Sequence, residues 1–265
     1  MLDIKGMARS TYYYGVKERT DKYVETRKAI SRIYQANRGR YGYRRVCMAL
    51  GAEGIHINHK TVQRLMKEMG MKGVRKKRAY RSYKGEVGRV APNVLQRDFT
   101  ADAPVRKWAT DVSQITIGDS KCYLSPILDL FNGEIVSYTV SDSPNLEMVT
   151  DMLRKAFRRE KNLRGLLLHS DQGWHYQHTQ YQHMLQVQGI VQSMSRKGNC
   201  LDNSVMENFF GLMKNELLYV NNFKNMDDFK RQLADYIDYY NNKRIKLKLK
   251  MSPVQYRTHF YRQIN

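Results

Sequence analysis

The chain has 265 residues, with 46 Lys or Arg against 25 Asp or Glu, so its formal net charge is +21. This length fits one medium domain plus a smaller one, and solubility alone would need far less charge. No apolar run approaches the ~20 residues of a membrane span, and the N-terminus lacks the apolar core of a signal peptide. We therefore expect a protein that stays in the compartment where it is made.

The charge is unevenly distributed along the chain. Residues 1–97 have 24 basic and 7 acidic residues, whereas residues 98–265 have 22 and 18. A basic front half on a near-balanced back half indicates a nucleic-acid-binding arm attached to a globular body. A membrane surface is the alternative partner, but the basic residues are scattered among Gly and Tyr rather than gathered on one amphipathic helix.

The three cysteines, Cys47, Cys122 and Cys200, lie far apart in the sequence and form no CxxC pair. Their spacing is typical of a reduced, cytosolic protein with buried thiols. Four histidines within residues 169–183 likewise fit no usual zinc spacing.

Residues 1–22 are interpreted as an N-terminal arm, because they lack apolar periodicity. Residues 23–71 are interpreted as an all-α domain, in which Asn58 is a good N-cap and Gly70 a good residue to end the last helix. The apolar spacing predicts helices over about 23–37, 43–52 and 60–69.

The last two of these helices, joined by a Gly-containing turn, indicate a helix-turn-helix DNA-binding domain. The second helix of such a pair enters the major groove near its N-terminus. An ordinary helical subdomain with a charged solvent face is the alternative interpretation. The DNA-binding interpretation predicts contacts from His59, Lys60, Gln63 and Arg64.

Residues 72–100 are interpreted as a basic linker with little apolar material, extended or mobile when alone. Against a phosphate backbone its charges would release counterions, and its tyrosines could pack on sugars or bases. The predicted DNA contacts in this linker are Arg75, Lys76, Lys77 and Arg78.

Residues 101–222 have an alternation of strand-like and helix-like runs that predicts an α/β domain. The order, three strands, then helix, strand, helix, strand and helix, resembles the ribonuclease-H-like fold with its mixed sheet. The first strand and the end of the fourth lie side by side in that fold. Strands are predicted over 107–117, 123–131, 134–140, 166–169 and 190–193, and helices over 145–159, 179–187 and 205–218.

Three acidic residues occupy positions in this domain where they could meet. Asp111 and Asp171 interrupt or end apolar strands, and Glu207 opens a helix. Converging carboxylates repel one another, so proteins keep them chiefly where metal ions neutralise them. We predict that the three are catalytic and bind Mg²⁺, with Mn²⁺ as a substitute, as two ions about 3.5–4 Å apart. The alternative is that Asp111 is a turn residue, Asp171 a cap and Glu207 a surface helix residue.

Other basic and polar residues are predicted to bind DNA near these carboxylates. Lys214 lies seven positions after Glu207, on the same helix face, and could touch phosphate; a solvated lysine is the alternative. The helical, basic segment 223–265 has a predicted helix over 226–241. The remaining predicted contacts are Asn208, the loop residues Arg196 and Lys197, and Lys243 and Arg244.

Several motifs together resemble those of a known family. They are residues 108–113 (WATDVS), 169–173 (HSDQG), 202–210 (DNSVMENFF), 239–244 (YYNNKR), 251–257 (MSPVQYR) and 41–45 (YGYRR). The chain resembles the second-frame transposases of the "insertion sequence three" family, whose core is like that of retroviral integrases. The resemblance covers nearly the whole chain. It departs at Lys246, where many relatives have a histidine.

The resemblance implies a catalytic triad of Asp111, Asp171 and Glu207, with Lys214 as the basic residue of the catalytic helix. It implies a bacterial, cytoplasmic, nucleoid-associated transposase that cuts double-stranded DNA at element ends and joins the exposed 3′ hydroxyl to a target. It also implies a homo-oligomer on paired ends and a first-frame partner or fusion. A nuclease that cuts without joining and a DNA-binding regulator with a non-catalytic core remain as alternatives.

Overall fold

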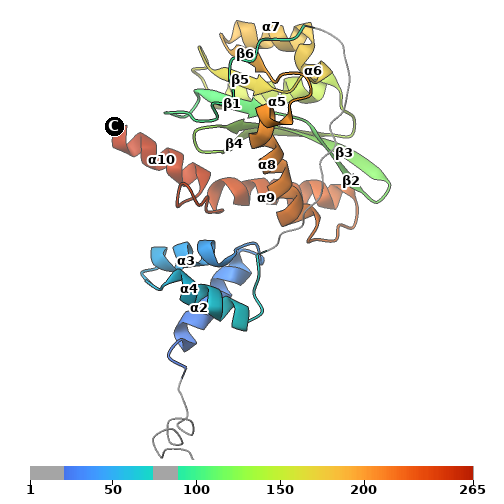
Figure 1. Ribbon diagram of the computed structural model, residues 1–265. Coiled ribbons are helices and arrows are strands. Elements are labelled where there is room, and N and C mark those ends of the chain that lie inside the picture. The colour runs from blue at the N-terminus through green and yellow to red at the C-terminus, as the bar shows by residue number, and fades with distance from the viewer. Residues whose placement is uncertain (1–20, 74–88, 265) are drawn as a thin grey trace, which may run out of the picture. The chain divides into compact units, whose positions relative to one another are not determined.

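The computed structural model describes residues 21–73 and 89–264, and the chain divides between Gly73 and Val74 into two compact units (Figure 1). Nearly all of the predicted N-terminal arm lies outside the described residues. So does the basic run that contains Arg75, Lys76, Lys77 and Arg78.

The first unit is the predicted three-helix domain. Asn58 starts the third helix as its N-cap, because its side chain accepts a hydrogen bond from Lys60 N at 2.8 Å, and Gly70 follows the helix at a φ of +71°. Ile30, Val46 and Leu65 are fully buried between the helices. The helices are α2 (Val24–Ala36), α3 (Tyr43–Ala52) and α4 (His59–Glu68).

The second unit is built on a mixed six-stranded sheet. Its strands are β1 (Lys107–Thr110), β2 (Ser113–Ile117), β3 (Ser120–Asp129), β4 (Ile135–Ser141), β5 (Leu167–Ser170) and β6 (Val191–Met194). β1, β2 and β4 pair antiparallel with β3, whereas β5 pairs parallel with β1 and β6 parallel with β5. The mixed sheet confirms the predicted fold class.

The first predicted strand is interrupted. β1 and β2 keep one register against β3, with Thr110 opposite Ile127 and Ser113 opposite Leu124. Between them, Asp111 and Val112 leave the ladder. The interruption gives the carboxyl group of Asp111 a place at a strand end rather than inside a continuous sheet.

Helices pack around the sheet (Figure 1). α5 (Leu146–Arg159), α6 (Trp174–Gln177) and α7 (Thr179–Val187) form one core cluster with the sheet. α8 (Ser204–Met213) contacts β1, and α9 (Met226–Asn242) contacts β3 and β4, outside that cluster. The chain ends in α10 (Pro253–Ile264).

Two details of the α8 region differ from the prediction of one helix through Leu218. The 3-10 turn η2 (Cys200–Asn203) precedes α8, and the π-helical turn η3 (Lys214–Leu218) follows it. π turns are found frequently at functional sites. The short helix α6 was not predicted either.

Residues 91–97, here named the strap, form part of the second unit. Pro92 O accepts a hydrogen bond from Met194 N at 3.3 Å, and Leu95 is buried. The C-terminal part of the predicted linker is therefore packed against β6. Among the helices of residues 21–73 and 89–264, none is long and apolar enough to cross a membrane.

Candidate active site

The parallel pairing of β1 and β5 places two aspartates side by side. Ala109 pairs with His169 in this register. Asp111 and Asp171 each follow two residues later, where both strands have ended. Carboxyl ends of neighbouring parallel strands are where open α/β sheets bind ligands. The prediction that the two aspartates meet at this edge agrees with the observed register.

Local hydrogen bonds fix both aspartates. Asp111 Oδ1 accepts from Val112 N at 2.7 Å, and Asp171 Oδ1 accepts from Gly173 N at 2.9 Å. A Cβ atom at Gly173 would lie 2.9 Å from Asp171 Oδ1 and 3.4 Å from the Tyr176 ring. Gly173 is therefore required by the close approach of the Asp171 carboxylate to its backbone.

Glu207 reaches this edge from the first turn of α8. The helix contacts β1, and Asn203, just before it, donates from Nδ2 to Thr110 O at 3.4 Å. This link joins the start of α8 to the residue before Asp111. Glu207 is half-buried, whereas Asn208 next to it is exposed.

The electrostatics show that the acidic groups share one environment. Burial, then the charges of Asp171 and Glu207, raise the pKa of Asp111 well above its ordinary value, while Lys214 acts in the opposite direction. Burial raises the pKa of Asp171 and of Glu207. Burial lowers the pKa of Lys214, whereas the negative charge of Asp111 raises it. Lys214, at the junction of α8 and η3, thus interacts electrostatically with Asp111.

The donor set fits a hard divalent cation. It consists of oxygens whose negative charge is disfavoured without a cation. Three buried side-chain oxygen atoms near the carboxylates have no hydrogen-bond partner within the described residues: Tyr176 OH, Tyr181 OH and Asn203 Oδ1. Over the described ranges, no group of three His, Cys, Asp or Glu side chains lies close enough together to hold a metal ion in this structure.

The four residues predicted to contact DNA in the first unit lie together at the N-terminal part of α4. His59, Lys60, Gln63 and Arg64 are all exposed. His59 stacks on Tyr43 with ring centroids 6.3 Å apart, and Arg64 Nη1 lies 2.7 Å from Glu68 Oε1. α4 thus presents a polar, basic face.

The remaining predicted DNA contacts divide into exposed and buried groups. Arg196, Lys197 and Lys243 are exposed. Arg244 is a correction: its side chain is 2% exposed, and its Nη2 lies 2.7 Å from Glu216 Oε1. This burial leaves no surface for a phosphate, so Arg244 is a structural residue that joins α9 to η3.

Sequence reasoning missed the residues that support the carboxylates. Tyr176 is buried against Tyr181, with ring centroids 5.3 Å apart, and carries one of the unpartnered hydroxyls. His169 is neutral, because burial lowers its pKa to about 4, and its Nδ1 lies 2.8 Å from Ser193 Oγ. The tyrosines follow Asp171 by five and ten residues, so only their nearness in sequence could have indicated them.

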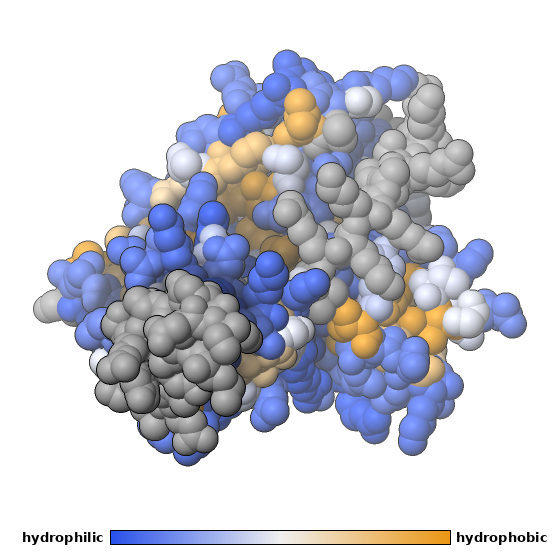
Figure 2. Space-filling view, turned by 60° about the horizontal axis from the view of Figure 1, so that its bottom comes forward, coloured by the Kyte–Doolittle hydropathy of each residue, from blue (hydrophilic) through white to orange (hydrophobic). Residues whose placement is uncertain are grey.

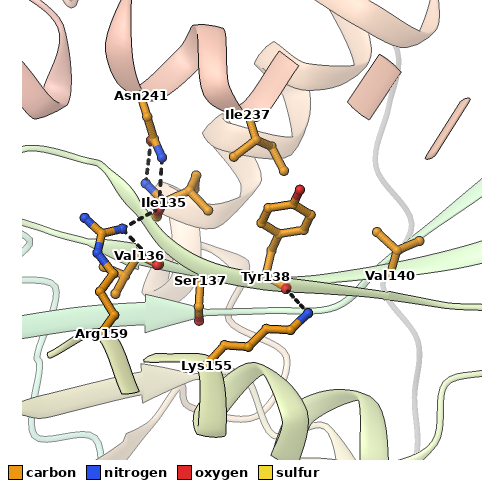
Figure 3. Close-up of a pocket in the computed structure, with 9 residues that line it drawn as sticks. All are labelled: Ile135, Val136, Ser137, Tyr138, Val140, Lys155, Arg159, Ile237 and Asn241. Carbon is orange, nitrogen blue, oxygen red and sulfur yellow. Dashed lines mark hydrogen bonds between the residues drawn. The ribbon is translucent and has the colours of Figure 1, made fainter. Parts of the chain in front are cut away.

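A separate hollow lies at the outer strand β4. It has a volume of about 530 Å³ and contains none of the three carboxylates (Figure 3). Side chains bind the strand's carbonyls here: Asn241 that of Ile135, Arg159 that of Val136 and Lys155 that of Tyr138, at 2.9–3.2 Å.

Comparisons with known proteins agree with this architecture. An HTH-like domain model matches residues 22–79, and integrase core domain models match residues 101–200 and 207–260. The putative transposase InsK of insertion sequence element IS150 from Escherichia coli K12 is 52% identical over 256 residues, 96% of this chain and 90% of that protein. The transposase of insertion sequence element IS904 from Lactococcus lactis is 34% identical, over 86% of this chain and 91% of that protein.

The fold also resembles that of one chain in a solved structure. A chain in the cryo-EM structure of the simian T-cell lymphotropic virus intasome, in complex with a PP2A regulatory subunit, aligns with a TM-score of 0.51. Sequence identity is 15%, and the alignment covers 86% of this chain and 74% of that one. This likeness concerns the fold.

The fold and the family models together define a protein with an integrase-like core behind a helix-turn-helix-like domain. More narrowly, the chain belongs to the IS3 family of insertion-sequence transposases. Its function is therefore DNA transposition.

Proposed function

We propose that this transposase is a divalent-metal-dependent polynucleotidyl transferase with Asp111, Asp171 and Glu207 as its catalytic triad. The observation that carries the proposal is the β1–β5 register, which sets Asp111 beside Asp171. In addition, the charges of Glu207 and Lys214 both shift the pKa of the Asp111 carboxyl group. Carboxylate oxygens in a buried setting are suited to Mg²⁺, with Mn²⁺ as a substitute, and two ions are the natural complement of three carboxylates.

Such ions, when bound, neutralise the carboxylates and polarise a phosphodiester. The three carboxylates would hold these ions, and Lys214 would contact an oxygen of the reacting phosphate. In the first step a water oxygen bonds to phosphorus and loses a proton. The bond between phosphorus and the 3′ oxygen breaks, and the leaving 3′ oxygen takes up a proton. In the second step that 3′ hydroxyl attacks a target phosphodiester and displaces another 3′ oxygen, so one bond forms for each bond broken.

The DNA partner is proposed to be the element ends and the target duplex. His59, Lys60, Gln63 and Arg64 would contact it from the first unit. Outside the grey atoms, much of the surface visible in Figure 2 is hydrophilic. Further contacts are proposed from Asn208, Arg196, Lys197 and Lys243, and from the basic run at Arg75, Lys76, Lys77 and Arg78.

Two ends must be held together during joining, so we propose a homo-oligomer on DNA. A first-frame partner or fusion, as the family resemblance implies, would add end recognition. A nuclease that cuts without joining remains the competing enzyme class. It differs in its product, because only a transferase yields covalently joined strands.

The test is a Mg²⁺-dependent cleavage and joining assay on DNA carrying the element's ends, with and without the first-frame partner. We expect Asp111→Asn, Asp171→Asn and Glu207→Gln each to abolish both products, while DNA affinity measured by anisotropy persists. Asp102→Asn, at an exposed acid of the same unit, is the matched control. Near wild-type turnover in any triad variant would sink the assignment, and cutting without joining by the wild type would favour the nuclease.

A further inference from the structure

Asp202 is a fully buried carboxylate outside the proposed triad. Five N–H donors converge on it. Oδ1 accepts from Arg97 Nε at 2.7 Å and from Arg196 Nη2 at 3.0 Å. Oδ2 accepts from Asn93 Nδ2 at 3.1 Å, and from Arg196 N and Nε at 3.0 and 2.9 Å. The hydrogen bonds with Arg196, then its other partners, lower the pKa of Asp202. Both oxygens are thus occupied by donors.

The donors come from two segments far apart in sequence. Asn93 and Arg97 belong to the strap, more than 100 residues before Asp202, and Arg196 follows β6. Asp202 itself lies in η2, which runs directly into α8, and Glu207 follows five residues later. A helix transmits a displacement of its first turn to every side chain of that turn. Asp202 therefore lies in the turn that leads directly into the first turn of α8, which carries Glu207.

The strap also contacts β6, the strand next to the one that leads to Asp171. Ser193 Oγ accepts from Val94 N at 3.0 Å and from Leu95 N at 3.1 Å. The same hydroxyl lies 2.8 Å from His169 Nδ1 on β5, two residues before Asp171. One short segment thus contacts η2, which leads to Glu207, and Ser193 of β6, which in turn contacts the strand that leads to Asp171.

The strap backbone is strained where it reaches Asp202. Gln96 and Arg97 have φ values of +48° and +65°, in the left-handed region that non-glycine residues rarely adopt. Such conformations persist only where surrounding contacts hold them. Here Asn93 Oδ1 accepts from Gln96 N at 2.9 Å, and Asp202 holds the Arg97 guanidinium.

We propose that Asp202 is a positioning residue: its carboxylate ties the strap to the start of α8 and thereby aligns Glu207 with Asp111 and Asp171. The proposal rests on the proposed function of those three residues. Asp202 belongs to the same sequence motif as Glu207. In the proposed role it contacts neither a metal nor the substrate.

The test compares Asp202→Asn with Glu134→Gln. Glu134 is the matched control, because it is also a buried carboxylate that binds two arginines, Arg159 and Arg257, but it lies in the β3–β4 turn region. Both substitutions keep shape and remove one charge. In Asp202→Asn the new amide group faces N–H donors, whereas Asp202→Glu keeps the charge.

We expect Asp202→Asn to lower the cleavage rate at saturating DNA by about 100-fold, the effect of a misplacement of about 1 Å in a reacting group. The half-maximal Mg²⁺ concentration should rise, DNA affinity should stay within about twofold, and Asp202→Glu should recover part of the rate. Glu134→Gln should leave the Mg²⁺ requirement unchanged. An unchanged Mg²⁺ requirement in Asp202→Asn, or a loss of DNA affinity that explains its slow rate, would overturn the proposal.

Hydrogen–deuterium exchange of α8 provides a second measurement that does not depend on catalytic activity. Amides of residues 204–213 should lose protection in Asp202→Asn and not in Glu134→Gln, and Arg97→Ala should produce the same local effect. Unchanged protection in Asp202→Asn would overturn the positioning role even in an active protein. If the wild type made no product, the proposed function would fail, and the exchange pattern would still decide whether Asp202 holds α8.

Discussion

Asp111, Asp171 and Glu207 carry charges in surroundings that disfavour them. Their raised pKa values mean that the folded protein binds protons at these groups more tightly than the unfolded chain does. In metal-free protein, their effect on stability is therefore most favourable below the ordinary pKa, 3.8 for Asp. That stability is lost as pH rises through the raised folded values.

This sign gives a prediction for thermal unfolding. At about pH 7.5, Mg²⁺ should raise the Tm of the wild type, and at about pH 4 it should not, because protons then occupy the carboxyls. Asp111→Asn should raise the metal-free Tm at the higher pH and reduce the gain from Mg²⁺. Calorimetry at both pH values checks this. An equal Mg²⁺ effect in Asp111→Asn and in wild type would contradict it.

Gly173 gives a second prediction at the residue scale. A methyl group there would lie 2.9 Å from Asp171 Oδ1, so Gly173→Ala must displace this carboxylate. We expect the cleavage rate to fall by about 10–100-fold with DNA affinity retained. Gly211→Ala is the control, since nothing lies within 4 Å of its added Cβ. Equal rates for the two variants would show that the Asp171 turn tolerates the methyl group.

Sequence reasoning at this scale predicted that the two aspartates meet, and it misassigned one arginine. Strand ends are visible as the end of an apolar run, so Asp111 and Asp171 could be predicted to meet. Arg244 was misassigned, because a basic run is normally a solvated face and its buried partner Glu216 lies 28 residues earlier. Arg97 and Asp202 are 105 residues apart, and no local pattern connects them.

At the scale of elements, most helices and strands followed from apolar periodicity and caps. α3 and α7 have the predicted bounds, and α4 begins after the predicted cap. The exceptions are short segments whose conformation is set by tertiary contacts: the break after β1, α6, η2 and the π turn η3. Periodicity needs several turns to be recognised, so single-turn features escape it.

The junction of α9 and η3 supports a stability prediction. Removing one partner of a buried ion pair leaves an uncompensated charge, so Arg244→Ala should lower the free energy of unfolding by about 3–5 kcal/mol. Lys243→Ala, at its exposed neighbour, should change it by less than about 0.5 kcal/mol. Denaturant titration of both variants makes the comparison. A similar, small effect in both would mean that Glu216 finds another partner.

At the scale of the whole molecule, the chain divides into a three-helix unit and a unit built on the mixed sheet. The predicted division at residue 71 lies close to the observed one after Gly73. The packing of the strap against β6 could not be predicted, because its hydrogen bonds go to Ser193 and Met194, about 100 residues later.

The net charge gives a prediction for DNA binding. The logarithm of the association constant should fall steeply and linearly with the logarithm of salt concentration, because phosphate contacts release counterions. Lys60→Ala should reduce the magnitude of that slope by about 1. Lys28→Ala, on α2 and paired with Glu25 at 2.9 Å, should leave it unchanged. Anisotropy titrations at several salt concentrations check this, and a flat titration of the wild type would refute the electrostatic argument.

The outer strands of the sheet have one more consequence. β4 has its carbonyls bound by Lys155, Arg159 and Asn241, and β6 has the strap beside it (Figures 1 and 3). Unprotected strand edges template amyloid-like stacking and domain exchange between identical chains. Because these contacts occupy β4 and β6, neither strand offers a free edge to a second copy of the chain.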